Sequence, residues 1–213
     1  MKKITNLLII DASGSMQSRT AEVKLGIREF IQDAARTLTD NQVELTTIIT
    51  EFSSAGYFRA LVNTNKLSEL NQHIANRYCP DGMTALYDAI GLSFELVPKK
   101  QDGVLVSIIT DGLENDSRTY SLEKVKSLIN KKKSKKKPWI ITFIGSSEAD
   151  LTHSAREIGI SEGNILQYGG SGRGFSASIS SGIRMKKSLV DHVVSGKAIQ
   201  QKTFAKDHQV EEK

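Results

Sequence analysis

The stretch LLIIDASGSMQS (residues 7–18) decides the fold. Four apolar residues run directly into Asp11, and two serines, Ser13 and Ser15, follow at alternate positions around a glycine. A short apolar run indicates a buried strand, and α/β sheets carry their sites at the carboxyl ends of strands. The stretch therefore predicts a first strand over residues 4–10 that ends in a polar site.

Strand signals alternate with helical signals along the rest of the chain. Apolar or β-branched runs predict strands over residues 43–50, 57–63, 103–110, 139–145 and 164–168. Apolar stripes predict helices over residues 23–38, 67–77, 86–97, 120–130, 149–159 and 176–194, the second with Leu67, Leu70 and Ile74 facing inward. The alternation predicts an α/β fold, with a doubly wound, mostly parallel, Rossmann-like central sheet and helices on both faces.

A turn signal and a polar end complete the predicted organisation. The sequence SSAG at residues 53–56 predicts a hairpin, which makes residues 57–63 the one antiparallel edge strand. After Gly196 the chain becomes polar. We therefore expect one domain over residues 1–195 and a flexible tail over residues 196–213.

Composition restricts the class of partner and compartment. The net charge of +5 is local: without the six lysines of residues 131–137, 23 basic residues remain against 24 acidic ones, a net charge of −1. These lysines follow a predicted helix, whose C-terminus favours cations, and no aromatic residue interleaves them, so nucleic acid or acidic lipid is the weaker interpretation. No apolar run is long enough for a membrane span, and the single Cys79 is compatible with a reducing, cytoplasmic setting.

Two further loops bring oxygen ligands to the predicted edge. Asp111 follows the apolar strand 103–110 as Asp11 follows the first strand, and Thr84 precedes the helix at 86–97. If the two strands are neighbours, their axes lie about 4.8 Å apart, and two carboxylates that close need a cation or a raised pKa. Only oxygen ligands are present in these loops, so the expected cation is Mg²⁺, with Mn²⁺ or Ca²⁺ as alternatives, and not Zn²⁺.

These residues resemble a known motif. Asp11-Ala12-Ser13-Gly14-Ser15 matches the D-x-S-x-S signature of the von Willebrand factor type A domain, and GMTALYDAI and ITDGLEND resemble its second and third metal loops in order and spacing. The resemblance covers residues 4–168 and is closest to bacterial or phage intracellular members. It implies a metal-ion-dependent adhesion site (MIDAS) formed by Asp11, Ser13, Ser15, Thr84 and Asp111.

The resemblance also implies a role for each residue and a type of partner. Ser13 and Ser15 would ligate directly, Asp11 through water, and Thr84 and Asp111 alternately with and without a bound ligand. An ion held mainly by neutral hydroxyls retains charge for an outside carboxylate, so the implied function is capture of an Asp or Glu on a partner protein. Intracellular members often work beside AAA+ ATPases, which makes an adaptor function an alternative.

Simpler interpretations and an enzymatic one stay open at this point. Asp11 and Asp111 could end strands in turns, and Ser13, Ser15 or Thr84 could cap helices. Residues 114–116 could be a rim that tunes partner choice or merely polar loop. A phosphohydrolase with Asp11 as nucleophile lacks a second acid at position 13, and a hydrolase with Ser13 as nucleophile lacks a suitably placed His, so we do not expect an enzyme.

Overall fold

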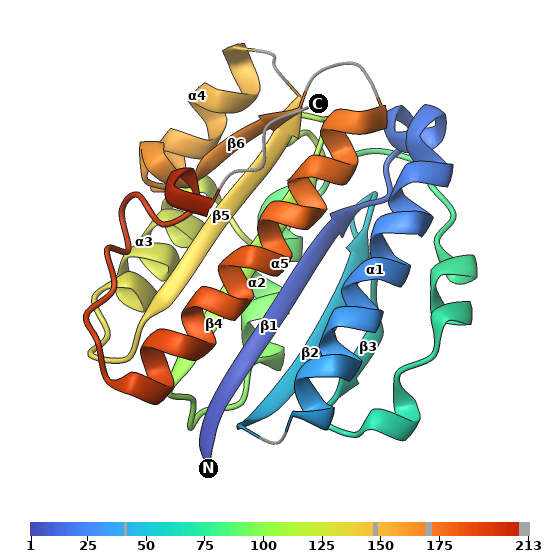
Figure 1. Ribbon diagram of the computed structural model, residues 1–213. Coiled ribbons are helices and arrows are strands. Elements are labelled where there is room, and N and C mark those ends of the chain that lie inside the picture. The colour runs from blue at the N-terminus through green and yellow to red at the C-terminus, as the bar shows by residue number, and fades with distance from the viewer. Residues whose placement is uncertain (41, 147–148, 169–171, 209–213) are drawn as a thin grey trace.

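A six-stranded sheet forms the centre of the described part of the chain. The computed structural model describes residues 1–40, 42–146, 149–168 and 172–208. The strands lie in the order β3-β2-β1-β4-β5-β6, and all neighbours are parallel except β2 and β3 (Figure 1). Their bounds are β1 (Lys2–Asp11), β2 (Val43–Phe52), β3 (Phe58–Thr64), β4 (Gly103–Thr110), β5 (Trp139–Ser146) and β6 (Ile165–Tyr168).

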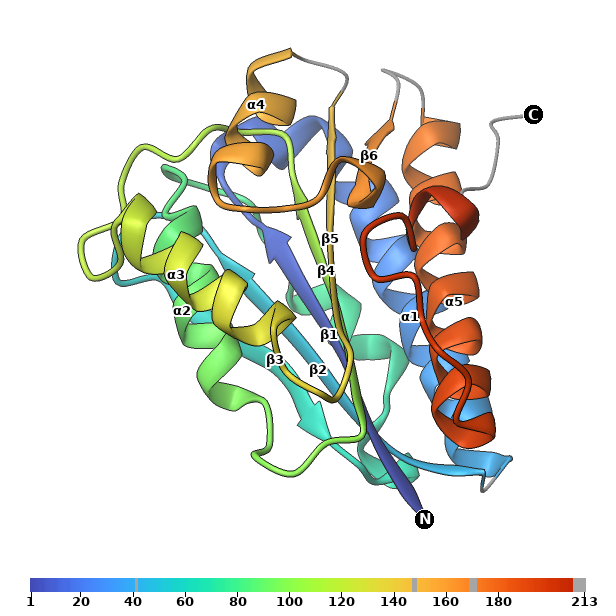
Figure 2. The same cartoon turned by 90° about the vertical axis from the view of Figure 1, so that its left-hand side faces the viewer.

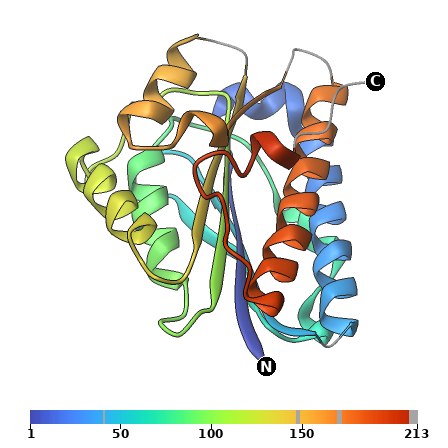
Figure 3. The same cartoon turned by 60° about the vertical axis from the view of Figure 1, so that its left-hand side comes forward.

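Helices cover both faces of this sheet. One face carries α1 (Thr20–Thr39) and α5 (Gly172–Ser195), and the other carries α2 (Leu86–Leu96), α3 (Leu122–Lys133) and α4 (Ala149–Glu157), as Figure 2 and Figure 3 show. Alternate residues of β1 supply the two cores, since Leu8 and Ile10 pack on the α1 side whereas Leu7 and Ile9 pack on the α2 side. The predicted α/β class, the two covered faces and the antiparallel edge strand are therefore confirmed.

The order of the strands places a topological switch point between β1 and β4, at the centre of the sheet. The chain proceeds outward from β1 to β3 in one direction and from β4 to β6 in the other. Ile10 of β1 pairs with Ile109 of β4, so both strands end side by side. In doubly wound sheets the loops separate at such a point and leave a crevice beyond the strand ends. The residues that follow β1 and β4 border that crevice.

One predicted helix is wrong. Residues 67–77 form two short 3-10 helices, Leu67–Glu69 and Gln72–Arg77, and Leu67 is 51% exposed rather than inward. Asn71 causes the break, because its side chain accepts a hydrogen bond from the His73 N–H and caps the second segment from an extended backbone conformation. Leu70 and Ile74 still pack against the core on the α1 side, as expected.

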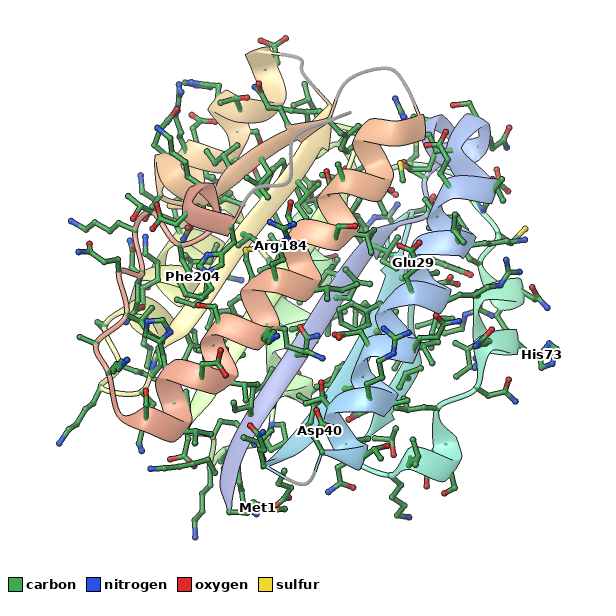
Figure 4. All side chains as sticks on the ribbon, viewed as in Figure 1. Met1, Glu29, Asp40, His73, Arg184 and Phe204 are labelled. Carbon is green, nitrogen blue, oxygen red and sulfur yellow. The ribbon has the colours of Figure 1, made fainter. Side chains whose placement is uncertain are left out.

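The segment after α5 differs from the free tail that we expected, at least through residue 208. Phe204 and Ala205 are buried in the α1-side core, and Phe204 lies on the part of the chain that returns beside α5 (Figure 4). Asn164 fixes this return: its amide donates to the Gln201 carbonyl and accepts from the Ala205 N–H at 2.7 and 3.0 Å. Gly163 permits it, because an added Cβ would lie 2.7 Å from the Thr203 Cα. The domain boundary at residue 195 stays a prediction.

We expect Phe204→Ala to lower the free energy of unfolding by about 3 kcal/mol or more, because it leaves a cavity in the core. The exposed neighbour Lys206 provides the control, and Lys206→Ala should change stability by less than about 0.5 kcal/mol. Denaturant unfolding of both variants measures the difference. Equal stability of the two would show that the segment contributes nothing to the folded core.

Candidate metal centre

Asp11 is held firmly at the crevice by burial and hydrogen bonds. It is the last residue of β1 and fully buried. Its Oδ1 accepts the Ser13 N–H at 2.7 Å, and its Oδ2 accepts the Thr110 hydroxyl at 2.5 Å. The Asp11 carbonyl accepts the hydroxyl of the buried Tyr78 at 2.7 Å. The bonds from Ser13 and Thr110 hold the carboxylate in one orientation, and the bond from Tyr78 holds the backbone of Asp11.

Burial makes the ionised form of Asp11 costly. The pKa of its carboxyl is raised from 3.8 to about 6, chiefly because the group is removed from water. Hydrogen bonds from Thr110 and Ser13 oppose this rise in the pKa, and the charge of Asp111 adds to it. Among the described residues no Lys, Arg or His forms an ion pair with Asp11. A positive charge placed in the crevice would therefore stabilise the carboxylate.

The serine hydroxyls connect the two acids. Ser13 Oγ lies 3.0 Å from Ser15 Oγ, and the Ser15 hydroxyl donates to Asp111 Oδ1 at 2.6 Å. Ser13 precedes the 3-10 helix at Gly14–Arg19 but makes no side-chain cap there. Its hydroxyl thus lies against the Ser15 hydroxyl and does not cap the helix, so helix capping does not explain this residue. Ser13 is buried whereas Ser15 is exposed, so the crevice opens on the Ser15 side.

Thr84 reaches the same place from the second loop. The surroundings of Gly112 show that these side chains lie close together. A Cβ added to Gly112 would lie 3.0 Å from Thr84 Oγ1 and 3.7 Å from both Asp11 Oδ2 and Ser15 Oγ. The cap of α2 is Ala85, so Thr84 does not serve as its N-cap. The structure therefore brings all five predicted side chains to one crevice: Asp11, Ser13, Ser15, Thr84 and Asp111.

The residues after Asp111 hold the Thr84 loop. Asn115 Oδ1 accepts the Thr84 N–H at 2.8 Å, and its own N–H donates to the Thr84 carbonyl at 3.0 Å. Glu114 accepts the Tyr87 N–H in the first turn of α2 at 2.8 Å, where a negative charge is favourable. These contacts give Glu114 and Asn115 a positioning role. The bonds join loops about thirty residues apart, so no local pattern in the sequence could reveal them.

Arg19, the last residue of the 3-10 helix at Gly14–Arg19, is the cation near Asp111. Its Nε lies 4.0 Å from Asp111 Oδ2, and its guanidinium lies 4.8 Å from the centroid of the Tyr168 ring. Its side chain also pairs with Glu22 at 3.5 Å. Arg19 therefore compensates part of the charge of Asp111, and Asp11 retains no comparable partner among the described residues.

The donor set fits a hard divalent ion. Two adjacent ligands in an Mg²⁺ octahedron with bonds near 2.1 Å lie about 3.0 Å apart, and the two serine hydroxyls are 3.0 Å apart. Within the described ranges no three His, Cys, Asp or Glu side chains are grouped to hold a metal. An ion here would consequently depend on the hydroxyls of Ser13, Ser15 and Thr84, with Asp11 and Asp111 supplying the negative charge.

Comparison with solved structures shows the fold. Proximal thread matrix protein 1 from the mussel byssus matches with a TM-score of 0.61 at 17% identity, over 91% of this chain and 46% of that one. The PilB minor pilin from Streptococcus sanguinis matches with a TM-score of 0.61 at 14% identity, over 89% of this chain and 62% of that one. The pilus adhesin SpaC from Lactobacillus rhamnosus GG matches with a TM-score of 0.62 at 13% identity, over 92% of this chain and 30% of that one. The chain thus spans about half the length of the mussel protein and less than two thirds of the pilus proteins.

A further structure of the mussel protein has a zinc-occupied MIDAS motif, and it matches with a TM-score of 0.59. No protein-family model matches the chain, and neither does any curated protein sequence. At these identities the likeness shows a von Willebrand factor type A-like α/β fold. It does not support the bacterial or phage intracellular type that the sequence suggested.

We expect Gly112→Ala to weaken binding of Mg²⁺ by more than about tenfold, because the ion requires near-ideal geometry and the new methyl group displaces the Thr84 hydroxyl. Gly182→Ala in α5 is the control, since the nearest atom to its added Cβ, Ser107 Oγ, lies 4.0 Å away. Calorimetric titration of both variants with Mg²⁺ measures the effect. Unchanged affinity in Gly112→Ala would place the ion elsewhere.

We expect Asp11→Asn to stabilise the metal-free protein at pH 7.5 by about 3 kcal/mol, the cost implied by a pKa raised from 3.8 to about 6. The folded state holds this proton more tightly than the unfolded state, so wild-type stability falls as pH rises from 3.8 to about 6. The gain from Asn should therefore shrink toward pH 4. Thermal unfolding in EDTA across this range tests it, with the exposed Asp150→Asn as control. A gain in stability that does not change with pH would contradict the raised pKa of Asp11.

Proposed function

We propose that this chain is a metal-dependent protein-binding module that captures an acidic side chain of a partner through a bound divalent ion. One observation carries the proposal: three loops bring hydroxyls of Ser13, Ser15 and Thr84 to the same crevice as two carboxylates. Mg²⁺ is the ion we propose, with Mn²⁺ or Ca²⁺ as alternatives, because all the donors are oxygen.

The balance of charge supports an acidic partner. Hydroxyl ligands do not neutralise the ion, and the Asp11 carboxylate is already engaged by Ser13 and Thr110. An ion in this shell would keep positive charge on its open side, next to the exposed Ser15. A carboxylate from outside supplies both an oxygen and the missing charge, which makes Asp or Glu the best ligand.

The surroundings of the crevice support a protein partner. Met83 is 50% exposed and Leu113 is 44% exposed, and each adjoins a residue of the crevice, Thr84 or Gly112. Large apolar side chains around a polar anchor are typical of protein interfaces, where they exclude water from the central contact. A partner carboxylate bound at the ion would bring its neighbouring residues onto these two side chains.

An enzymatic function has less support. The contact of Ser13 Oγ is the Ser15 hydroxyl, whereas a serine nucleophile needs an imidazole base. The matched solved structures are a matrix protein and pilus proteins, which fits a binding function. Work beside an AAA+ ATPase and a cytoplasmic location remain predictions from the sequence. In the part of the chain that the structure describes, no helix combines the length and the apolar character that crossing a bilayer requires.

We expect Ser13→Ala to abolish measurable Mg²⁺ binding with folding intact, because it removes a buried direct ligand. Ser18→Ala changes an exposed serine of the same loop region and should bind Mg²⁺ like the wild type. Thr84→Ala should weaken partner capture more than metal uptake, because its proposed role belongs to the ligand-bound form. Calorimetry with Mg²⁺, Mn²⁺, Ca²⁺ and Zn²⁺ measures metal uptake. Retention of partner proteins on the immobilised chain, with and without EDTA, measures capture.

Two results would contradict this proposal. One is Mg²⁺ binding by Ser13→Ala that equals binding by Ser18→Ala. The other is turnover of a phosphate or ester substrate that depends on Mg²⁺ and is lost in Ser13→Ala, which would indicate a hydrolase.

A further inference from the structure

The amino ends of the strands lie at the other end of the sheet from the metal centre (Figure 1). A second polar region lies there. The loop between α3 and β5 and the loop between α2 and β4 enclose a cavity of about 410 Å³ there. This volume lies within the range of small-molecule sites. Among the described residues that line the cavity there is no carboxylate, and five are lysines: Lys99, Lys132, Lys135, Lys136 and Lys137.

Part of this lysine cluster has a structural role. Lys132 lies over the ring of Trp139, with its Nζ 4.3 Å from the ring centroid. Lys137 pairs with Asp102 at 2.6 Å. Lys99, Lys135 and Lys136 are exposed, and no ion pair to a described carboxylate is found for them. Contacts within the protein therefore engage three of the five cations, since Lys135 Nζ also lies 5.6 Å from the centroid of the Trp139 ring. Lys99 and Lys136 line the cavity with no ion pair to a described residue.

Other features of the cavity point to a ligand. Burial lowers the pKa of Lys132, and the nearby charges of Lys135 and Lys131 lower it further. The side-chain oxygen of Gln101, which also lines the cavity, is buried and lacks a hydrogen-bond partner among the described residues. A buried acceptor without a donor is unfavourable. A hydroxyl group carried by the ligand would satisfy this oxygen, whereas a phosphate oxygen, which accepts hydrogen bonds, would not.

We propose that this cavity binds a small ligand with several phosphate groups, either free or as the headgroup of a lipid. Phosphates carry between one and two negative charges each and accept hydrogen bonds from lysine ammonium groups in many orientations. Several of them together match the five lysines of the cavity in charge. A single carboxylate would leave most of the cations unpaired. A duplex nucleic acid is too wide for a cavity of this size, and the floor residue Trp139 is only 5% exposed and cannot stack on a base.

Trp139 provides the measurement, since it is the one tryptophan of the chain and the ammonium groups of Lys132 and Lys135 lie 4.3 and 5.6 Å from its ring centroid. We expect inorganic triphosphate, added at low ionic strength without divalent metal, to change its fluorescence with saturation in the micromolar range, and calorimetry to give the same affinity. Lys135→Glu combined with Lys136→Glu should weaken binding by more than about tenfold. Both residues are exposed in a turn, so the fold should be retained, and thermal unfolding checks this.

Matched controls separate this site from general charge effects and from the metal centre. Lys187→Glu combined with Lys206→Glu makes the same change in charge at exposed positions outside the cavity and should leave the affinity within about twofold. Ser13→Ala should bind triphosphate like the wild type. Vesicles containing phosphorylated inositol lipids test the headgroup source, and binding that triphosphate displaces would support the proposal. Absence of triphosphate binding, equal loss in both double variants, or binding of duplex DNA alone would overturn it.

Discussion

The burial of the Asp11 carboxylate at the junction of β1 and β4 is the constraint around which the carboxyl edge of the sheet is organised. A charged group without water is unfavourable, and the chain surrounds it with donors: a backbone N–H from its own loop and the Thr110 hydroxyl from the neighbouring strand. Those donors offset only part of the cost, since the pKa of Asp11 stays raised. The fold thus retains a local excess of negative charge at the place where three hydroxyls converge. Stability and the proposed metal binding depend on the same group.

The elements that position this edge could be predicted because their signals are local. Strand β4 is buried along its whole length, and its apolar run marks it in the sequence. The first strand and the D-x-S-x-S stretch are equally clear in the sequence, and the order of the loops places Thr84 at the same edge of the sheet. The structure places the five predicted side chains together, while their role as metal ligands stays a proposal.

Features that depend on distant contacts could not be predicted. Glu114 and Asn115 act on the α2 loop, and nothing in their own neighbourhood indicates that partner. Phe204 is one aromatic residue in a polar stretch, so no periodic pattern distinguishes it from a surface residue, yet Asn164 and Gly163 fix its segment against the core. Asn71 divided a predicted helix because a cap outweighed three correctly spaced apolar residues. The lysines of residues 131–137 were visible in the sequence, but the cavity that they line required the fold.

The central position of β1 has a consequence for how the chain acquires its structure. This strand is synthesised before the other five described strands, and one of its two neighbours, β4, follows much later in the chain. Asp11 at the end of β1 and Thr110 at the end of β4 are 99 residues apart. Contacts between such distant segments slow folding, because a long loop must close before they form. During synthesis, the backbone N–H and C=O groups of β1 that later pair with β4 stay unpaired, and its apolar side chains stay partly uncovered, until β4 has been made. That interval is when the nascent chain is most exposed to aggregation, and chaperones that shield apolar strands would act on it then.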